Sequence, residues 1–329
     1  MRIAYLTQAY PPVISGAAIF AHQLAETMVK RGHQVLVIAP SGNGQPGMVI
    51  QGGLSILNLR SFNNPLRVRQ RFMLYPHKTI MSALKKFQPD VIHTHDSLQV
   101  GMIGLTYARR TGIPIITTTH QLPWFVANHL PDKLSIRKNV EDALWGYARW
   151  LLRQYTVLVT PTQTVSDTVR RRTGLGTQVI SYGVDQQKFR PPLSLDEKTA
   201  ARKKLNLPPD VPVLLHVGQL HTAKRVEYAI RSAAQAMQNT NAHLLVVGDG
   251  PQRVNLIKIC AALGIADRAH FPGFITAENG LPEVYRLADM FITASEIETQ
   301  GIVLLEAAAS GLPIEIGRAS CRERVYSSV

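Results

Sequence analysis

The feature of this sequence that most constrains its fold is the alternation of short apolar segments with longer amphipathic ones. Residues 3–9 are predicted to form a strand, residues 17–31 a helix and residues 34–39 a second strand. Such a unit is expected to be right-handed, with its two strands parallel in one sheet. The alternation therefore predicts an α/β fold built on parallel sheets.

The same alternation continues along the chain, whose 329 residues are enough for two domains of ordinary size. An apolar share of 45% indicates globular domains with hydrophobic cores. A segment rich in proline and charge, residues 186–211, interrupts the pattern and is expected to hold one short helix, residues 200–205. We therefore predict an N-terminal domain over residues 1–185, a linker over residues 186–211 and a second domain over residues 212–313.

Residues 314–329 do not continue this pattern, because they contain no apolar period. A doubly wound domain normally continues at such a point with a further strand and further helices. We expect residues 314–329 to be foreign sequence in place of the native end, which would leave the second domain incomplete. An unpaired sheet edge and a smaller core would then destabilise the chain.

The sequence predicts a cytoplasmic protein. Residues 1–6 have the pattern of a buried strand instead of a secretory leader, and no apolar run approaches the ~18 residues that a membrane span needs. Two cysteines, Cys260 and Cys321, give neither a disulfide framework nor a metal-ligand cluster. This cysteine usage fits a reducing compartment.

The net charge of +14 is concentrated in the first half of the chain. Residues 1–190 hold 22 Lys and Arg against 8 Asp and Glu, whereas residues 191–329 hold 14 of each kind. Nucleic acid, an anionic membrane or an anionic small substrate can each explain such an excess, and so can a solvated basic surface.

The residues around position 70 favour a membrane over nucleic acid. Three arginines at positions 67, 69 and 71 precede the apolar and aromatic residues 72–75. Cations attract anionic lipid while apolar groups enter the interface, so this composition is typical of a membrane-surface patch. Base-stacking proteins share the composition, but the chain contains no RNA-binding or zinc-finger motif. We therefore expect a peripheral location on the inner face of a membrane and no nucleic-acid partner.

Two carboxylates lie eight positions apart where a predicted strand gives way to a predicted helix. Glu298 follows the strand at residues 290–295, and Glu306 lies in an Ala-rich segment that ends at Gly311. A wholly helical span would separate them by about 12 Å, enough to reach two ends of one polar ligand. Gly301 allows the chain to turn and lets backbone N–H groups approach an anion. Taken alone, the pair also fits a solvated helix face.

Histidines follow two predicted strands of the first domain. His95 and Asp96 end the strand at residues 89–96, and His120 ends the strand at residues 112–120. Ligands gather at the carboxyl ends of parallel strands, so these side chains are well placed for a binding cleft, although a lone histidine there is more often structural. The apolar residues 123–127, with Trp124 and Phe125, are suited to binding a hydrophobic acceptor substrate or to forming part of the hydrophobic core.

The second domain opens with a strand that ends at Gly218. Gln219, Lys224 and Arg225 then lead into a helix from Val226. A nucleotide diphosphate needs cations and backbone amides at such a place. The segment is therefore a candidate phosphate site.

Together these segments resemble retaining glycosyltransferases of family 4, whose GT-B fold consists of two Rossmann-like, doubly wound parallel-sheet domains that face each other across a cleft. The Glu298–Glu306 pair resembles the family's E-x7-E signature. The loop before Gly16 resembles P-P-x-x-G-G with Ser15 in place of the first Gly, and residues 180–191 resemble I-x-N-G-V-D-x-x-x-F-x-P with Tyr182 in place of Asn. The resemblance covers residues 1–313.

The resemblance implies a hexosyltransferase that moves a sugar, with retention of configuration, from a nucleotide-sugar to an acceptor hydroxyl. It implies catalytic roles beside the sugar for His120 and Glu298, and contact of Glu306 with the nucleotide ribose. The family carries Arg where this chain has Gln219, so one fixed positive charge is missing. The other donor-binding residues that it implies are Gly16, Gly218, Gln219, Lys224, Phe274, Ile275, Gly301 and Ile302.

The nucleotide-sugar would be a co-substrate, and the resemblance implies no metal or other cofactor; the chain contains no D-x-D sequence. The basic first half and the Trp124–Phe125 segment favour a membrane lipid as acceptor, and hence glycolipid biosynthesis. Two alternatives remain: a related protein that epimerises a nucleotide-sugar, which would need a further acid and base, and an inactive fragment. The sequence leaves open the donor base, the sugar, the acceptor and the oligomeric state.

Overall fold

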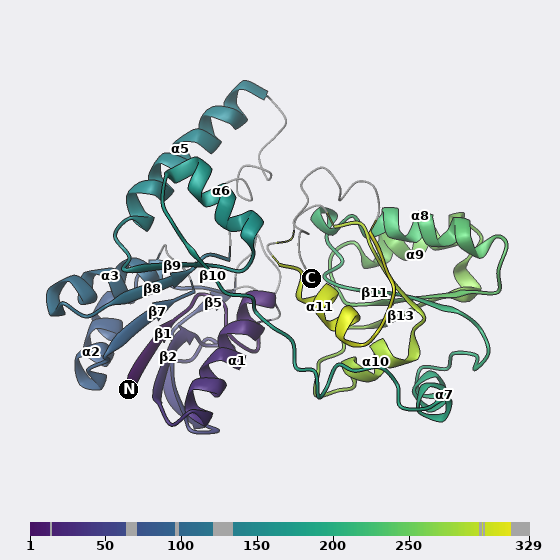
Figure 1. The fold of residues 1–329 in the computed structure, drawn as a ribbon, viewed down its shortest axis with the longest axis horizontal. Helices are drawn as coiled ribbons and strands as arrows, with labels where there is room; N and C mark the ends of the chain where they lie inside the picture. Colours follow the sequence, from purple (N-terminus) through teal and green to yellow (C-terminus); the bar gives the residue numbers. More distant parts are fainter. Residues whose placement is uncertain are drawn as a thin grey trace. The chain divides into compact units, whose positions relative to one another are not determined.

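The computed structural model describes residues 1–13, 15–63, 71–95, 99–120, 134–295, 298 and 300–316. The chain divides into two units, Met1–Tyr182 and Gly183–Val329. Each unit contains a mainly parallel sheet with helices on both faces (Figure 1), which confirms the predicted pair of Rossmann-like domains. The sequence predicts the boundary after residue 185, and the structure divides the chain after Tyr182.

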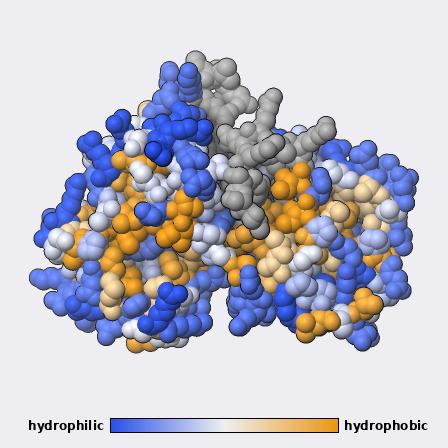
Figure 2. All heavy atoms as spheres, viewed as in Figure 1, coloured by the Kyte–Doolittle hydropathy of each residue, from blue (hydrophilic) through white to orange (hydrophobic). Residues whose placement is uncertain are grey.

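Hydrophilic residues cover much of the visible face of each unit, with smaller apolar areas between them (Figure 2). Within the part of the chain that the structure describes, every helix is too short or too polar to cross a bilayer.

The first unit is built on an eight-stranded sheet with the strand order β10-β9-β8-β7-β1-β2-β4-β3. Neighbouring strands are parallel except β3 and β4, which form an antiparallel hairpin. A separate antiparallel ribbon joins β5 (Phe62–Asn63) to β6 (Arg71–Phe72). The strands of the main sheet are β1 (Arg2–Leu6), β2 (Gln34–Pro40), β3 (Gly47–Gln51), β4 (Leu54–Leu59), β7 (Val91–Thr94), β8 (Ile115–Thr118), β9 (Val157–Thr160) and β10 (Gln178–Val179).

The helices of this unit are α1 (Gly16–Lys30), α2 (His77–Phe87), α3 (Gln99–Thr111), α5 (Leu134–Leu152) and α6 (Gln163–Thr173). Helix α1 begins at Gly16 because the Ser15 hydroxyl accepts a hydrogen bond from the Ala18 amide at 3.2 Å. The sequence does not predict α3, since glycines at 101 and 104 weaken its helical signal. A Cβ on Gly104 would lie 3.0 Å from the Leu6 side chain, so glycine allows α3 to approach β1 closely.

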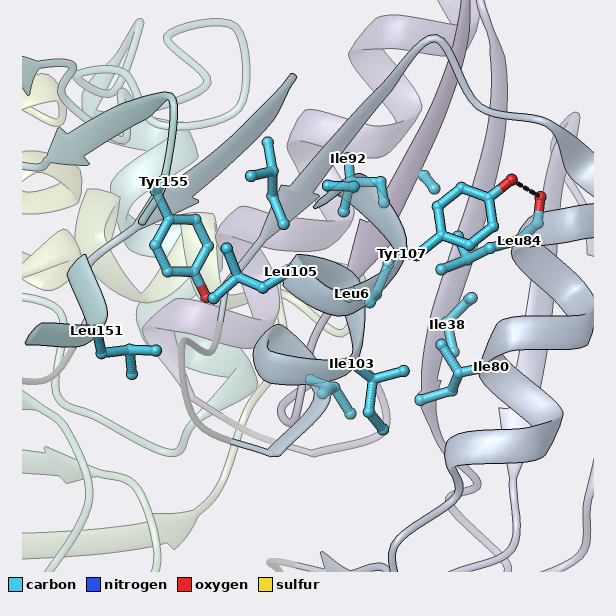
Figure 3. Packing of buried hydrophobic residues seen from close by; sticks show 14 of the residues in the cluster. Leu6, Ile38, Ile80, Leu84, Ile92, Ile103, Leu105, Tyr107, Leu151 and Tyr155 are labelled. Carbon is cyan, nitrogen blue, oxygen red and sulfur yellow. Dashed lines mark hydrogen bonds between the residues drawn. The ribbon is translucent and has the colours of Figure 1, made fainter. Parts of the chain in front are cut away.

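Alternate residues of the central strands enter two different cores. Ala4 and Leu6 belong to a cluster with α2 and α3, whereas Ile3 and Tyr5 belong to a cluster with α1. Figure 3 shows the first cluster, in which the Tyr107 hydroxyl donates to the Leu84 carbonyl at 3.1 Å. Because both sheet faces are covered, the strands are apolar on both sides, as expected for a parallel sheet.

The second unit is built on a five-stranded parallel sheet with the order β13-β12-β11-β14-β15. Here too, alternate residues of β11, such as Leu215 and Leu214, face different clusters. The strands are β11 (Val213–Val217), β12 (His243–Val247), β13 (Ala269–Gly273), β14 (Met290–Thr293) and β15 (Ile314–Ile316). The helices are α7 (Leu195–Lys204), α8 (Val226–Met237), α9 (Arg253–Ala262), α10 (Leu281–Leu287) and α11 (Ile302–Ala309), with single 3-10 turns η1 (Thr222–Lys224) and η2 (Ala266–Arg268).

The segment predicted as a linker contains a helix that is longer than expected. Helix α7 begins at Leu195 because the Ser194 hydroxyl accepts from the Glu197 amide at 3.2 Å. It packs on α10 through the buried Arg202, which donates to the Leu287 carbonyl at 3.1 Å and pairs with Asp289 at 2.7 Å. The helix is thus anchored to the second unit.

The chain continues into the sheet after Pro313, where the sequence predicts no further strand. Ile314–Ile316 forms β15, which pairs in parallel with β14 from Phe291 to Thr293. Three residues are too few to show an apolar period, which explains why the strand is missing from the sequence prediction. The rest of the expected foreign segment, residues 317–329, lies outside the described residues.

Replacing Gly248 by alanine should destabilise the second unit strongly. Gly248 has a φ of +146°, and a Cβ there would lie 1.8 Å from the Gly218 carbonyl oxygen. We expect Gly248→Ala to lower the free energy of unfolding by about 3 kcal/mol or more, because backbone strain and overlap add. Gly264 has a φ of +71° with open space around it, so Gly264→Ala should cost about 1–2 kcal/mol. Urea unfolding compares the two, and equal losses would contradict the steric argument.

Candidate active site

The candidate site of the second unit lies at the point where the strand order of its sheet reverses. Strand β11 is the central strand of the sheet. From β11 the chain adds β12 and β13 toward one edge of the sheet and then β14 and β15 toward the opposite edge. Ligands of doubly wound sheets bind at the carboxyl ends of strands at such a point. The segments that follow β11 and β14 carry Gly218, Lys224 and Glu298, so the topology brings these predicted residues together.

Lys224 and Glu298 form an ion pair in which the Lys224 Nζ lies 2.5 Å from the Glu298 Oε1. The side chains are 27% and 18% exposed, so the pair is shielded but reachable from solvent. Lys224 ends the turn η1, and Arg225 then adopts a left-handed φ of 48° before α8 begins. An ammonium group beside a carboxylate can bind a phosphate and a sugar hydroxyl at the same place.

The loop after β11 is held by the glycine loop after β12. The Leu220 amide donates to the Asp249 carbonyl at 3.0 Å, and the Gly218 amide donates to the Val247 carbonyl at 3.0 Å. A Cβ on Gly250 would lie 2.5 Å from the Leu220 carbonyl oxygen, so only glycine permits this approach. The backbone beside the candidate phosphate site is therefore fixed by neighbouring backbone.

Two residues that could replace the missing arginine at position 219 have other contacts. His221 accepts a hydrogen bond through Nδ1 from the Ala223 amide at 3.4 Å, which caps η1. The Arg225 guanidinium lies over the Tyr228 ring at 5.6 Å. Lys224 is thus the cation that the structure places against Glu298.

His216 is a buried residue of this site that the sequence analysis does not identify. Its Nδ1 lies 3.0 Å from the Ile292 carbonyl oxygen and donates to it. Burial lowers the pKa of His216 to about 4, although this hydrogen bond acts in the opposite direction. Its Nε2 has no hydrogen-bond partner among the described residues and would lie 3.4 Å from a Cβ on Gly218. At that distance a Cβ would make an ordinary van der Waals contact with the neutral imidazole, and no sequence signal indicates that His216 lies beside Gly218.

Glu306 is a buried carboxylate held by a tyrosine. Its Oε2 accepts a hydrogen bond from the Tyr285 hydroxyl at 2.7 Å. Burial raises the pKa of Glu306 to about 7, against the lowering effect of this bond. Tyr285 belongs to α10 and precedes Glu306 by 21 residues, so no local pattern could reveal the pair.

The helix that carries Glu306 begins after Gly301, which has a φ of 68°. Glu298 therefore precedes the helix, and the 12 Å estimate for a wholly helical span does not apply. Gly301 and Ile302 lie at the helix N-terminus, where unpaired N–H groups and the helix dipole favour an anion. Among the described residues, no side chain caps this end.

Phe274 and Ile275 follow β13 at the carboxyl edge of the same sheet. Phe274 is exposed, whereas Ile275 packs against the apolar cluster that includes Tyr285 and Leu304. Their predicted contact with a nucleotide base remains a prediction.

The first unit brings three histidines together at the carboxyl ends of β7 and β8. The Nδ1 of His95 lies 3.0 Å from the Nε2 of His120. The Nδ1 of His120 lies 2.6 Å from the hydroxyl of Tyr182. The Nε2 of His93 lies 2.8 Å from the Thr118 hydroxyl, and its ring stacks on that of His95. Tyr182 occupies a position that differs from the family pattern, but no sequence signal indicates its contact with His120.

These imidazoles are neutral at physiological pH. Burial lowers the pKa of His93 to about 4 and, together with the neighbouring His93, lowers the pKa of His120 to about 3. Burial and both neighbours also lower the pKa of His95 well below its ordinary value. The cluster can therefore donate and accept hydrogen bonds but does not carry positive charge.

The remaining predicted residues of the first unit are only partly described. Gly16 is the first residue of α1. Asp96, Trp124 and Phe125 lie outside the described residues. Throughout residues 1–13, 15–63, 71–95, 99–120, 134–295, 298 and 300–316, no three His, Cys, Asp or Glu side chains are arranged to hold a metal ion.

Comparison with known proteins relates both units to glycosyltransferases. A family model described as Glycosyltransferase Family 4 matches residues 14–188, and one described as Glycosyl transferases group 1 matches residues 197–320. Two relatives named α-monoglucosyldiacylglycerol synthase are similar over 95% of this chain. The protein from Streptococcus pneumoniae is 27% identical, with 70% of its length covered, and that from Acholeplasma laidlawii is 28% identical, with 79% covered.

Solved structures show the same fold. Sucrose-phosphate synthase from Thermosynechococcus elongatus superposes with a TM-score of 0.77 at 23% identity, over 96% of this chain and 81% of that one. Anabaena HepE in complex with UDP-glucose superposes with a TM-score of 0.72 at 18% identity, over 97% of this chain and 81% of that one.

Replacing Glu306 by glutamine should stabilise the chain at high pH. The carboxyl binds its proton more tightly in the folded state, with a pKa of about 7, than at the ordinary value of 4.5. The wild type should therefore lose up to about 3 kcal/mol of unfolding free energy between pH 4.5 and 7. Glutamine still accepts from Tyr285 but has no charge to bury, so Glu306→Gln should be more stable by about 1–3 kcal/mol at pH 8.

Urea unfolding at pH 5 and pH 8 measures this difference. Glu283→Gln, which alters the surface pair of Glu283 with Lys204, is the control and should differ little from the wild type in stability at either pH value. A Glu306→Gln variant that is no more stable than the wild type at pH 8 would contradict the burial argument.

Proposed function

Because the chain belongs to Glycosyltransferase Family 4 and is a nucleotide-sugar-dependent glycosyltransferase, we propose that its second unit binds the donor through Lys224, Glu298 and Glu306, and that its first unit binds the acceptor. The observation that carries this proposal is the shielded Lys224–Glu298 ion pair at the strand-order reversal of the second sheet. A cation for the diphosphate and a carboxylate for the sugar lie there side by side.

When the donor binds, Lys224 would contact its diphosphate and Glu298 would contact its sugar. The diphosphate brings negative charge to Lys224 and to the N-terminus of α11, where Gly301 and Ile302 lie. The Glu298 oxygen that pairs with Lys224 would then accept hydrogen bonds from hydroxyls of the sugar. The pair thus keeps each charge compensated before and after binding, which avoids leaving an isolated buried charge.

Glu306 is suited to the nucleotide ribose. Tyr285 engages its Oε2, so the other carboxylate oxygen would accept hydrogen bonds from ribose hydroxyls. The ionised carboxylate only accepts hydrogen bonds, whereas the protonated form also carries a donor. The pKa of Glu306, about 7, lies close to physiological pH. Donor binding should therefore tighten as pH rises from 6 to 8.

The proposed reaction is a displacement on one face of the sugar. The acceptor hydroxyl oxygen forms a bond to the anomeric carbon on the face from which the diphosphate departs. The bond from that carbon to the phosphate oxygen breaks, its electron pair stays on the diphosphate, and the diphosphate takes the hydroxyl proton. Lys224 and the α11 N-terminus stabilise the departing charge. The neutral imidazole of His120 and the side chain of Glu298 would orient the sugar.

The proposal assigns no step to a metal ion or other cofactor, because Lys224 and helix amides serve the diphosphate. Activity that persists in EDTA would agree with it. Epimerisation needs an additional acid and base, whereas the neutral histidines of the first unit are already paired with each other, with Thr118 or with Tyr182. The relatives also favour transfer over this alternative.

We propose a membrane lipid of the diacylglycerol type as the acceptor. Two relatives are named α-monoglucosyldiacylglycerol synthase. In the first unit, Leu74 and Tyr75 are 70% and 62% exposed, next to exposed Phe72 and Lys78. Apolar side chains beside basic ones suit a peripheral position on an anionic membrane face. Arg67 and Arg69, which the sequence assigns to this patch, lie outside the described residues.

One nucleotide-sugar from a panel of UDP-, GDP- and ADP-sugars should stabilise the protein. A ligand that binds only the folded state adds about 2.7 kcal/mol at one hundred times its Kd. Thermal unfolding should show this stabilisation as a higher Tm with the nucleotide-sugar than without it, and the increase in Tm should be larger at pH 8 than at pH 6. Lys224→Met should abolish it, whereas Lys204→Met, which breaks the surface pair with Glu283, should retain it. If no nucleotide stabilises a cooperatively unfolding protein, the donor site is wrong.

The exposed apolar residues should be needed for membrane binding. We expect the double variant Leu74→Asp, Tyr75→Asp to float less with vesicles containing anionic lipid, because it removes apolar contact and adds negative charge. Val254→Asp changes a similarly exposed apolar residue of the second unit and should float like the wild type. Equal flotation with neutral vesicles, or none with anionic ones, would contradict the electrostatic basis.

A further inference from the structure

Tyr182 lies where the chain leaves the first unit, at a position where the family pattern carries Asn. Its hydroxyl oxygen is 2.6 Å from the Nδ1 of His120. Its ring lies 4.4 Å from that of Phe20, which also contacts His120 and His95. The phenol is thus held on one side by α1 and presents its hydroxyl to His120.

Both ring nitrogens of His120 face a polar atom. Nδ1 faces the Tyr182 hydroxyl, and Nε2 faces the His95 Nδ1 at 3.0 Å. A neutral imidazole has one donor and one acceptor, so these partners decide which nitrogen carries the proton. Neither partner alone fixes the choice, because a phenol and an imidazole can each donate or accept.

The separation between His120 and Tyr182 is compatible with an O–H donor. The Tyr182 hydroxyl lies 2.6 Å from Nδ1, within the range of O–H donors. Donation by this hydroxyl would place the His120 proton on Nε2, which would then donate to His95. The remaining N–H of His95 is then on its buried Nε2, which has no partner among the described residues.

We propose that Tyr182 is a positioning residue for His120: its hydroxyl fixes the plane of the imidazole and places the His120 proton on Nε2. This inference rests on the proposed role of His120 in orienting the transferred sugar. A fixed ring and tautomer present the same hydrogen-bonding group to each sugar, whereas a ring held only by His95 can rotate and exchange tautomers.

The kinetic test is Tyr182→Phe, which removes the hydroxyl and keeps the ring against Phe20. We expect kcat to fall about tenfold, the effect of losing one well-placed hydrogen bond, and the donor KM to change by less than about twofold. Tyr107→Phe removes another tyrosine hydroxyl of the same unit, bonded to the Leu84 carbonyl, and should leave kcat unchanged.

The spectroscopic test uses full-length protein with nitrogen-15-labelled histidine. The ring-nitrogen shifts should show a single tautomer of His120, protonated on Nε2, in the wild type and in Tyr107→Phe. In Tyr182→Phe the His120 signals should show exchange between both tautomers. His120→Ala assigns the signals. An unchanged single tautomer in Tyr182→Phe would overturn the inference, whether or not the protein is active.

A double-mutant cycle separates this inference from the role of His120 itself. If Tyr182 acts through His120, Tyr182→Phe should lower kcat no further in a His120→Ala background. An equal loss in both backgrounds would overturn the inference and leave the role of His120 standing. Full activity of His120→Ala would instead overturn the proposed role of His120, and with it the functional part of this inference.

Discussion

Burial of both sheet faces is the constraint on which the rest of this structure depends. In each unit, alternate residues of the central strands enter different apolar clusters, as Ala4 and Tyr5 do in β1. Both faces of these strands are therefore mainly apolar. Polar side chains can gather where the strands end, and the reversal of strand order leaves space there. Lys224 and Glu298 in the second unit, and His95 and His120 in the first, occupy such ends.

The sequence predicts those parts of the structure that depend on local pattern. Alternating apolar segments predict the strands, and capping residues such as Ser15 fix helix starts. Helix α3 is not predicted because its glycines weaken the helical signal, although Gly104 allows close packing against Leu6. Strand β15 is not predicted because three residues are too few to show an apolar period. In the site, the resemblance to the E-x7-E signature identifies Glu298 and Glu306, whose spacing alone also fits a solvated helix face. Tyr285, His216 and Tyr182 contact their partners across long stretches of chain, so their roles depend on tertiary structure that no motif encodes.

The two carboxylates of the signature differ in how their charge is compensated. Glu298 has the Lys224 ammonium group at 2.5 Å, which compensates the carboxylate charge while the pair is largely shielded from water. Glu306 accepts a hydrogen bond from the neutral hydroxyl of Tyr285, and burial holds its pKa near 7. A neutral hydrogen bond compensates a buried charge less well than an ion pair. The second carboxylate therefore weakens the fold at high pH.

The first unit differs electrostatically from the second, because it places the imidazoles of His93, His95 and His120 against one another. If each carried a proton on both nitrogens, their mutual repulsion and burial would be costly. Burial instead keeps them neutral, and each can then donate to one neighbour and accept from another. Because each imidazole is neutral, it carries one ring proton, and the hydrogen-bond partners along His95, His120 and Tyr182 determine which nitrogen carries it.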